Sequence, residues 1–252
     1  MKNYSTLILL NTKKILGITR ILTLEHLREP TSVMWSAIAP CILFLLTQNH
    51  TEAELAQIDF YIARASWFLS YISANVAFFG FSFYLIGRRE SGFTRSFIYQ
   101  RGAIARFLAA HFLSYSTVSL IYAGVFYLAT KLPYGDYQAL ELIYLSACFY
   151  TSFLIFSCIG LVVASLPIKF DTASTLFSLL SFLMLLSGYV GNTQANSTPH
   201  GVLSFNPLLL SSKIFTHEAP LLACFLIALS GLLTGLYLTG RNFRIQPVWS
   251  RY

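Results

Sequence analysis

The sequence predicts an all-α, polytopic membrane protein, and three observations support that fold class. Hydrophobic residues make up 56% of the 252 residues and charged residues only 11%, whereas soluble domains carry about 25% charged residues. Six apolar runs follow one another along the chain, each long enough for a helix to cross a bilayer, which takes roughly 20 residues. Basic residues gather in alternate segments between these runs. We therefore expect a single transmembrane domain over residues 1–252.

Residues 1–30 carry too many charges to cross a membrane and are expected to form an interfacial helix. Apolar side chains at Ile15, Ile18 and Leu22 recur at helical spacing among the lysines and arginines of this segment. A helix of this composition lies along the membrane surface. Pro30 is expected to end it, because the residue before a proline is disfavoured in the helical conformation.

Six transmembrane helices are expected within residues 31–239, followed by a tail at 240–252. The expected spans are Thr31–Thr47, Trp67–Ile86, Phe107–Thr130, Leu142–Leu166, Thr172–Val190 and Pro220–Thr239. Pro40 should kink the first span, a distortion that membrane helices tolerate. Of the 17 Lys and Arg residues, all but Arg64, Lys131 and Lys213 lie in segments on the inner side of this topology. An excess of positive charge marks the cytoplasmic side, so both termini are expected in the cytoplasm and the chain in the cell membrane.

An apolar patch, Val202–Ser211, lies in the outer segment before the sixth span. It is too short to cross a bilayer, and Asn206 and Pro207 interrupt it. We expect a re-entrant segment that dips into the outer leaflet without crossing it.

The inner loop Gly87–Arg106 carries a dense cluster of positive charge. One acid, Glu90, accompanies five arginines, which are Arg88, Arg89, Arg95, Arg101 and Arg106. Two interpretations remain open at this point. The loop either sets the orientation of the chain through its charge alone, or it is a docking surface for a cytoplasmic partner.

The same loop has the pattern of a short helix. Gly92 and Gly102 bracket it, and Gly102 is expected to act as its C-terminal stop. Phe93, Phe97 and Ile98 would then share one face, because residues three to four apart lie on the same side of a helix.

Several kinds of catalytic and coupling site are missing from the sequence. No Asp, Glu, Lys or Arg lies within the six apolar runs, although proton-coupled transporters need ionisable groups there. His111, near one end of the third span, is interpreted as an interfacial side chain. The chain has no G-x-x-x-x-G-K-[ST] motif for ATP, and its four cysteines lack the C-x-x-C spacing of metal sites. We therefore expect no catalytic residue, no metal and no cofactor on this chain.

Several different short motifs are spread in order along nearly the whole chain. The motifs are Leu27-Arg28-Glu29-Pro30 before a span with Pro40, Arg89-Glu90-x-Gly92 after the second span, Leu186-Ser187-Gly188 in the fifth, then Pro199 and Asn206-Pro207. In this order they resemble the type-2 permease family of ABC exporters. The sequence departs from the family where many members have proline, at Arg101-Gly102 and at Tyr189-Val190-Gly191.

The resemblance implies a permease subunit that is not itself an enzyme. Two such chains, expected as a homodimer among membrane lipids, would pair around a central path, and separate ABC ATPase subunits would hold ATP and Mg. It also implies site residues. Those for coupling to the ATPase are Glu90, Gly92, Phe93, Arg95, Phe97 and Ile98; those of the elbow helix are Arg28, Glu29 and Pro30; those of the outer gate or re-entrant segment are Ser187, Gly188, Asn206 and Pro207. No nucleic-acid partner is expected, since the net charge of +7 lies at the ends of apolar runs.

Two other functions are alternatives to that of a permease subunit. An ion-coupled secondary transporter would need polar groups at mid-depth, for which Asn75 is the best candidate. An intramembrane enzyme acting on lipid would need converging His, Asp, Glu or Lys residues, and none converge in the sequence.

The substrate of an exporter is left open by the sequence, as hydrophobic or amphipathic and drug-like, lipid-like or glycan. Aromatic residues crowd the second span, namely Phe78, Phe79, Phe81, Phe83 and Tyr84. They either line a path for the substrate or face lipid.

Overall fold

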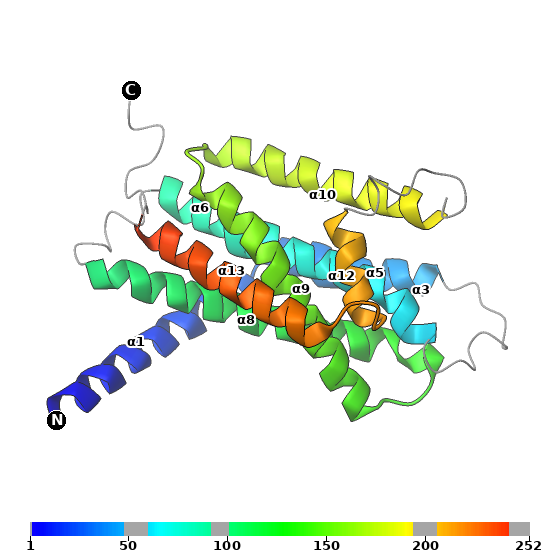
Figure 1. Cartoon of the computed structure of the whole chain (residues 1–252), viewed down its shortest axis with the longest axis horizontal. Helices are drawn as coiled ribbons and strands as arrows, with labels where there is room; N and C mark the ends of the chain where they lie inside the picture. The colour runs from blue at the N-terminus through cyan, green and yellow to red at the C-terminus, as the bar shows by residue number, and fades with distance from the viewer. Residues whose placement is uncertain (1, 48–59, 92–100, 194–205, 242–252) are drawn as a thin grey trace.

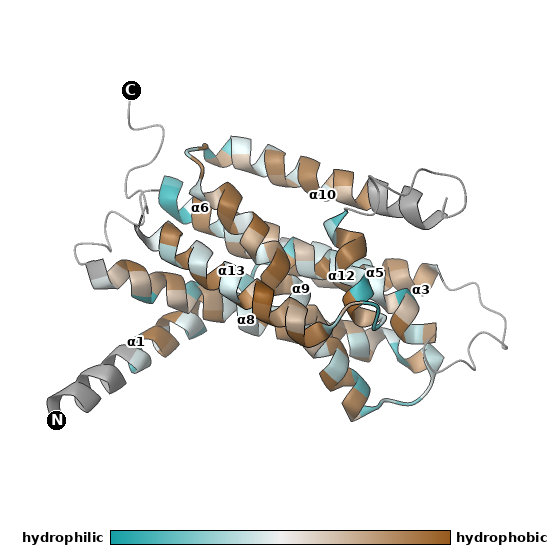
Figure 2. Ribbon diagram, in the orientation of Figure 1, coloured by the Kyte–Doolittle hydropathy of each residue, from teal (hydrophilic) through white to brown (hydrophobic). Residues whose placement is uncertain are grey.

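The computed structural model describes residues 2–47, 60–91, 101–193 and 206–241, and every regular element within these ranges is helical. The expected all-α fold is therefore confirmed for the described residues. Most of the helices run back and forth along one long axis, and α1 projects from one end of the bundle (Figure 1). Apolar residues cover the helices along their lengths, while the more hydrophilic residues lie mainly near turns and helix ends (Figure 2).

The helices follow one another with few long breaks. In chain order they are α1 (Lys2–Leu27), α2 (Pro30–Val33), η1 (Met34–Ile38), α3 (Ala39–Leu46), α5 (Phe60–Asn75), η2 (Val76–Ser82), α6 (Phe83–Glu90), α8 (Arg101–Thr130), η3 (Leu132–Tyr134), α9 (Ala139–Ser165), α10 (Phe170–Thr193), α12 (Pro207–Phe215) and α13 (Leu221–Arg241). Here η1 and η2 are π-helical turns, and η3 is a short 3-10 helix.

Within the residues that the structure describes, four helices are long and apolar enough to cross a membrane. They are Phe60–Glu90, Gly102–Thr130, Ala139–Ser165 and Leu221–Gly240. The apolar stretches Met34–Leu46 and Phe170–Leu186 are shorter. The chain is thus a membrane-type helical protein, and the count of six spans stays a prediction.

The central helix of the bundle is the continuous run of α5, η2 and α6. Its most apolar window is 78% buried, whereas that of α13 is only 11% buried. Neighbouring helices approach it closely at glycines. A Cβ atom on Gly160 of α9 would collide with Ser82, and one on Gly80 would lie 2.6 Å from Tyr115 Cε1. These positions allow α9 and the Tyr115 ring to pack directly on the π-helical turn.

Phenylalanine rings fill the core around this turn. Phe78 and Phe81 are fully buried, and the Phe78 ring lies 5.6 Å from that of Phe177 and 5.7 Å from that of Phe156. Both expectations for Phe78 and Phe81, a substrate path or lipid contact, are therefore wrong. These rings hold α9 and α10 against the central helix.

His111 belongs to the same core, and its interpretation as an interfacial side chain is wrong. The imidazole is fully buried, stacks on the Phe81 ring at 5.2 Å, and has Nε2 2.8 Å from the Phe81 carbonyl oxygen. An N–H donated to that oxygen satisfies one ring nitrogen, and the surrounding aromatic rings exclude the rest of the side chain from solvent.

Gly102 lies in the first turn of α8, so the expectation that it stops a preceding helix is wrong. The first residues of a helix have no intrahelical partner for their N–H groups, and glycine is tolerated there better than in a helix interior. The short helix expected before it falls on residues 92–100, outside the described residues.

The Gly231-x-x-x-Gly235 sequence of α13 packs against α9 of the same chain. A Cβ atom on Gly231 would lie 3.3 Å from Cys158 Sγ, and one on Gly235 would lie 3.2 Å from Leu161 Cδ1. Small residues let helix backbones approach closely in membranes. This pair therefore serves helix packing within the chain.

Candidate functional site

A cleft of about 850 Å³ lies beside the central helix. Its walls come from α1, α2 and η1 on one side, from α5, η2 and α6 at the back, and from α10 on the other side. These helices correspond to the interfacial helix and to the first, second and fifth apolar runs. The cleft therefore joins segments that are far apart in the sequence.

Aromatic side chains form a large part of the cleft wall. Trp35 comes from η1, Tyr71, Phe79 and Phe83 from the central helix, and Phe182 from α10. Phe79, Phe83 and Tyr84 are the members of the aromatic cluster of the second span that reach this cleft. Phe78 and Phe81 lie on another side of the helix, because successive residues of a helix are rotated by about 100° around its axis.

Two π-helical turns contribute residues to the walls of the cleft. One carries Trp35 and Ser36, and the other carries Phe79. A π-helical turn adds a residue to the turn and often marks a functional site. The first turn directly precedes the helix that contains Pro40, which has no N–H to donate to the preceding turn. A π-helical turn therefore lies directly before Pro40, and the kink expected at this proline stays a prediction.

A polar contact lies deep in the cleft between the central helix and α10. The Ser181 hydroxyl donates to Asn75 Oδ1 at 3.3 Å, and both residues are buried. Ser36 and Ser178 also line the cleft. The cleft thus offers hydrogen-bonding groups among rings, which is the usual character of a small-molecule site.

Charged side chains stand at the end of the cleft that lies near α1 and α6. Glu25, Glu29 and Arg88 line it there. The Arg88 guanidinium pairs with the Glu25 carboxylate, hydrogen-bonds the Tyr84 hydroxyl, and has its carbon 4.7 Å from the Tyr84 ring centroid. We call this end the inner mouth, because the loop Gly87–Arg106, which is expected on the inner side, begins here in the last turn of α6.

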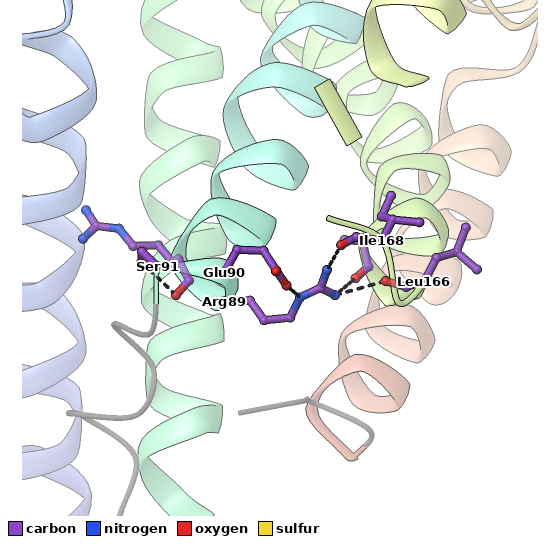
Figure 3. Close-up of polar contacts among 7 residues, drawn as sticks. Arg89, Glu90, Ser91, Leu166 and Ile168 are labelled. Carbon is purple, nitrogen blue, oxygen red and sulfur yellow. Dashed lines mark hydrogen bonds and ion pairs between the residues drawn. The ribbon is translucent and has the colours of Figure 1, made fainter. Parts of the chain in front are cut away.

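Arg89 and Glu90, next along the chain, form a buried anchor at the same end (Figure 3). Arg89 Nε donates to Glu90 Oε1 at 3.0 Å. Its terminal nitrogens donate to the carbonyl oxygens of Ala164, Leu166 and Ile168 at 3.0, 3.1 and 2.7 Å.

These carbonyls belong to the end of α9 and the turn into α10, where helix carbonyls lack intrahelical partners. A planar guanidinium with five donors can reach several oxygens at once. The anchor therefore ties the end of α6 to the turn between α9 and α10, next to the segment expected to couple to an ATPase.

Among the expected coupling residues, only Glu90 lies in the described part of the chain, where it pairs with Arg89. Gly92, Phe93, Arg95, Phe97 and Ile98 lie outside the described residues. The expected docking face is thus not tested.

The elbow residues Arg28, Glu29 and Pro30 link α1 to α2. α1 ends at Leu27 and Pro30 begins α2, so the expected helix end at this proline is confirmed. The Glu29 carbonyl accepts the Val33 N–H at 3.2 Å. Glu29 lines the cleft, and Arg28 does not.

His26 holds the end of α1 against α8. Its Nε2 lies 3.2 Å from the Tyr122 hydroxyl, and its Nδ1 lies 3.4 Å from the Tyr115 hydroxyl. Burial lowers the pKa of His26 to about 4, so the imidazole is neutral at physiological pH. No sequence pattern singled out this contact, which forms only when α1 and α8 pack.

The expected outer-gate residues fall into two groups. Ser187 and Gly188 lie in α10, and their side chains are outside the described residues. Asn206 caps α12, with its Oδ1 accepting the Leu208 N–H at 2.9 Å and its Nδ2 donating to the Met184 carbonyl at 2.9 Å. Pro207 is the first residue of α12.

α12 is packed into the bundle rather than lying free on it. Ser211 is buried and hydrogen-bonds Ser152 at 2.7 Å and Ser70 at 3.1 Å. The Tyr144 hydroxyl donates to the carbonyls of Ile214 and Phe215 at 3.0 Å. The depth of this helix in a membrane stays a prediction.

Sequence reasoning missed the cleft itself, although α10 carries a signal for it. Ser178 and Ser181 are three residues apart within the stretch Leu176–Leu186 of α10, whose other residues are apolar, and both line the cleft. Polar residues at helical spacing in a membrane helix mark a face turned away from lipid. The partner face, with Trp35 and Asn75, becomes visible only after folding.

Comparison with known proteins gives one similarity over nearly the full length. The chain is 28% identical over 234 residues to Protein McbE of Escherichia coli, and the alignment covers 91% of this chain and 96% of that protein. No family model matches the chain.

Proposed function

We propose that this chain is the permease subunit of an ATP-driven ABC exporter that moves a hydrophobic or amphipathic substrate across the cell membrane. The observation that carries the proposal is the aromatic cleft between the first, second and fifth apolar helices, placed next to the Arg89–Glu90 anchor. Such a site can hold a substrate, and the anchor can link it to a cytoplasmic motor. A second copy of the chain would complete the path, and both termini would be cytoplasmic.

The charge pattern favours an external energy source. No Asp, Glu, Lys or Arg lies within the six apolar runs, so the chain offers no carboxylate or amine there for proton coupling. The one histidine in these runs, His111, is held by the Phe81 carbonyl. It also has no phosphate-cradling loop. ATP and Mg would be held by a separate ABC ATPase, and this chain would contribute binding and movement without catalysis.

The anchor suggests how a movement of the ATPase on the cytoplasmic side would be transmitted to the cleft. α6 ends at Glu90, and the expected coupling segment follows directly. Arg89 connects that end to the turn that begins α10, and α10 carries Ser181 and Phe182 on the cleft wall. A displacement of the coupling segment would therefore move two walls of the cleft together.

Removal of Phe93 and Phe97 tests this function. Burying one Phe side chain contributes about 1.5–3 kcal/mol, so Phe93→Ala with Phe97→Ala should weaken ATPase association by more than tenfold. Membrane insertion should stay normal. The measurement is co-purification of a partner ABC ATPase co-expressed with this chain, with Arg106→Ala as the control for loop charge. Full retention of the ATPase by the double variant would contradict the docking role.

An ion-coupled secondary transporter is the second candidate, and the buried Asn75–Ser181 contact favours it. Polar groups inside a membrane bundle are sites at which ions or substrates bind. The two candidates differ in their driving force. Uptake driven by a proton or sodium gradient in ATP-free vesicles would support this alternative, and we expect none.

A further inference from the structure

The charged groups at the inner mouth of the cleft are unbalanced. Two carboxylates, Glu25 and Glu29, line it together with a single guanidinium, that of Arg88. The whole chain carries a net charge of +7. The net negative charge of the cleft lining is therefore local, and it is opposite in sign to the net charge of the whole chain.

Arg88 is already engaged by its neighbours. It pairs with Glu25, bonds the Tyr84 hydroxyl and stacks on the Tyr84 ring. Opposite charges in contact nearly cancel when seen from a distance. Glu29 has no ion pair with any cation of the described residues within 4.0 Å, so its carboxylate supplies the net charge of the mouth.

The adjacent Arg28 makes no ion pair with Glu29 within 4.0 Å among the described residues. Arg28 is exposed and lines a neighbouring depression together with Ile21, Leu24 and the two acids of the mouth, Glu25 and Glu29, but it does not line the cleft. A ligand in the cleft would thus meet Glu29 and would not meet Arg28.

The aromatic wall above the mouth favours the same sign of charge. Trp35 is 67% exposed and Phe182 is 59% exposed, so both rings are available to a ligand. The face of an aromatic ring is negative and attracts cations. An apolar cation can contact these rings while its charge remains near Glu29.

We propose that the cleft binds amphipathic organic cations and that Glu29 selects their charge. The proposal rests on the proposed function, because it takes the cleft as the substrate site of the exporter. It narrows the substrate from any amphipathic molecule to a class with an apolar body and one positive charge. Anionic amphipaths of the same shape are excluded by Glu29 and by the ring faces.

Two ions of nearly the same size and opposite charge test the proposal. Tetraphenylphosphonium and tetraphenylborate are added to the purified full chain in phosphatidylcholine nanodiscs. Binding is measured by equilibrium dialysis, and partition into empty nanodiscs of the same lipid is subtracted. We expect the cation to bind at least tenfold more tightly than the anion, with a preference that shrinks as salt screens the exposed carboxylate.

Three variants identify the responsible group. Glu29→Gln should remove the preference, whereas Asp171→Asn, a change of an exposed acid at the same end that does not line the cleft, should keep it. Glu25→Gln frees the charge of Arg88 and should shift the preference toward the anion. Melting temperatures of all variants are recorded, and we expect that of Glu29→Gln to match the wild type.

Equal binding of the two ions overturns the proposal, as does a cation preference that survives in Glu29→Gln. The failure of the proposed function would look different. If the Glu29-dependent preference is observed but no ATPase associates and no transport requires ATP, the cation site stands and the exporter function falls.

Discussion

The Arg89 guanidinium donates hydrogen bonds to one carboxylate and to several backbone carbonyls that would otherwise be unpaired. Its side chain is 5% exposed and that of Glu90 is 7% exposed, so both charges are removed from water. A buried ion pair is stable only when its remaining hydrogen-bonding groups are also satisfied. The three backbone carbonyls meet that requirement for the guanidinium.

Truncation of Arg89 should therefore be strongly destabilising. Arg89→Ala leaves the Glu90 carboxylate buried without its partner, and breaking a buried pair costs about 3–5 kcal/mol. The control is Arg88→Ala, which breaks a pair with side chains 19% and 41% exposed and should cost about 1 kcal/mol or less. Thermal unfolding in detergent measures both. Equal losses would show that Arg89 does not anchor the turn between α9 and α10.

α12 illustrates how a short helix is fixed by its ends and by one polar face. Asn206 caps its first turn, and Ser211 joins it to α5 and α9. Hydrogen bonds between helices in membranes each contribute about 0.6–2 kcal/mol. These contacts locate a helix of only nine residues, which would not be stable alone.

Loss of the Asn206 side chain should loosen α12. Asn206→Ala removes the cap, worth about 0.5–2 kcal/mol, and also the donor to the Met184 carbonyl. Asn206→Ser keeps a capping oxygen and loses the amide donor without adding a charge, so its effect should be smaller. Hydrogen–deuterium exchange at the amides of residues 208–210 reports the change.

Ser212→Ala serves as the control for this comparison, because the Ser212 hydroxyl bonds only the Leu209 carbonyl of the same helix. We expect its exchange rates to stay near those of the wild type. If Asn206→Ala also exchanges at the wild-type rate, the cap does not hold α12 in place.

At the scale of the whole molecule, each end of the bundle carries its own set of buried polar contacts. One end carries the Arg89–Glu90 anchor. The other carries a buried Lys131–Glu141 pair at 2.7 Å and a hydrogen bond of 2.9 Å between Tyr61 and Thr130. Each set joins helix ends that the expected topology places on one side of the membrane.

The expected topology predicts which residues are accessible from outside the cell. In a background without the four native cysteines, single cysteines at Gln57 and Gln194 should react with a membrane-impermeant maleimide. Cysteines at Ser96 and Ser250 should react only after the membrane is made permeable. Labelling at Ser96 from outside would overturn the six-span arrangement.

The sequence by itself determined the helical class, the membrane character and several helix ends. These features depend on local properties: apolar length, proline at Pro30 and the Asn206–Pro207 break. The expected stop at Gly102 is wrong because a glycine is compatible with the start of a helix as well as with its end. Local sequence patterns thus locate a helix boundary more reliably than they show whether a helix begins or ends there.

Only the tertiary structure decided which apolar side chains lie in the core and which line the cleft. Phe78 is in the core, Phe79 lines the cleft, and His111 is buried among rings although it lies near one end of the third apolar run. In a membrane protein the lipid-facing surface is as apolar as the interior, so hydropathy cannot separate these positions. The cleft with Glu29 and Trp35 forms when three distant helices pack, and the contacts that create it have no counterpart in the order of residues along the chain.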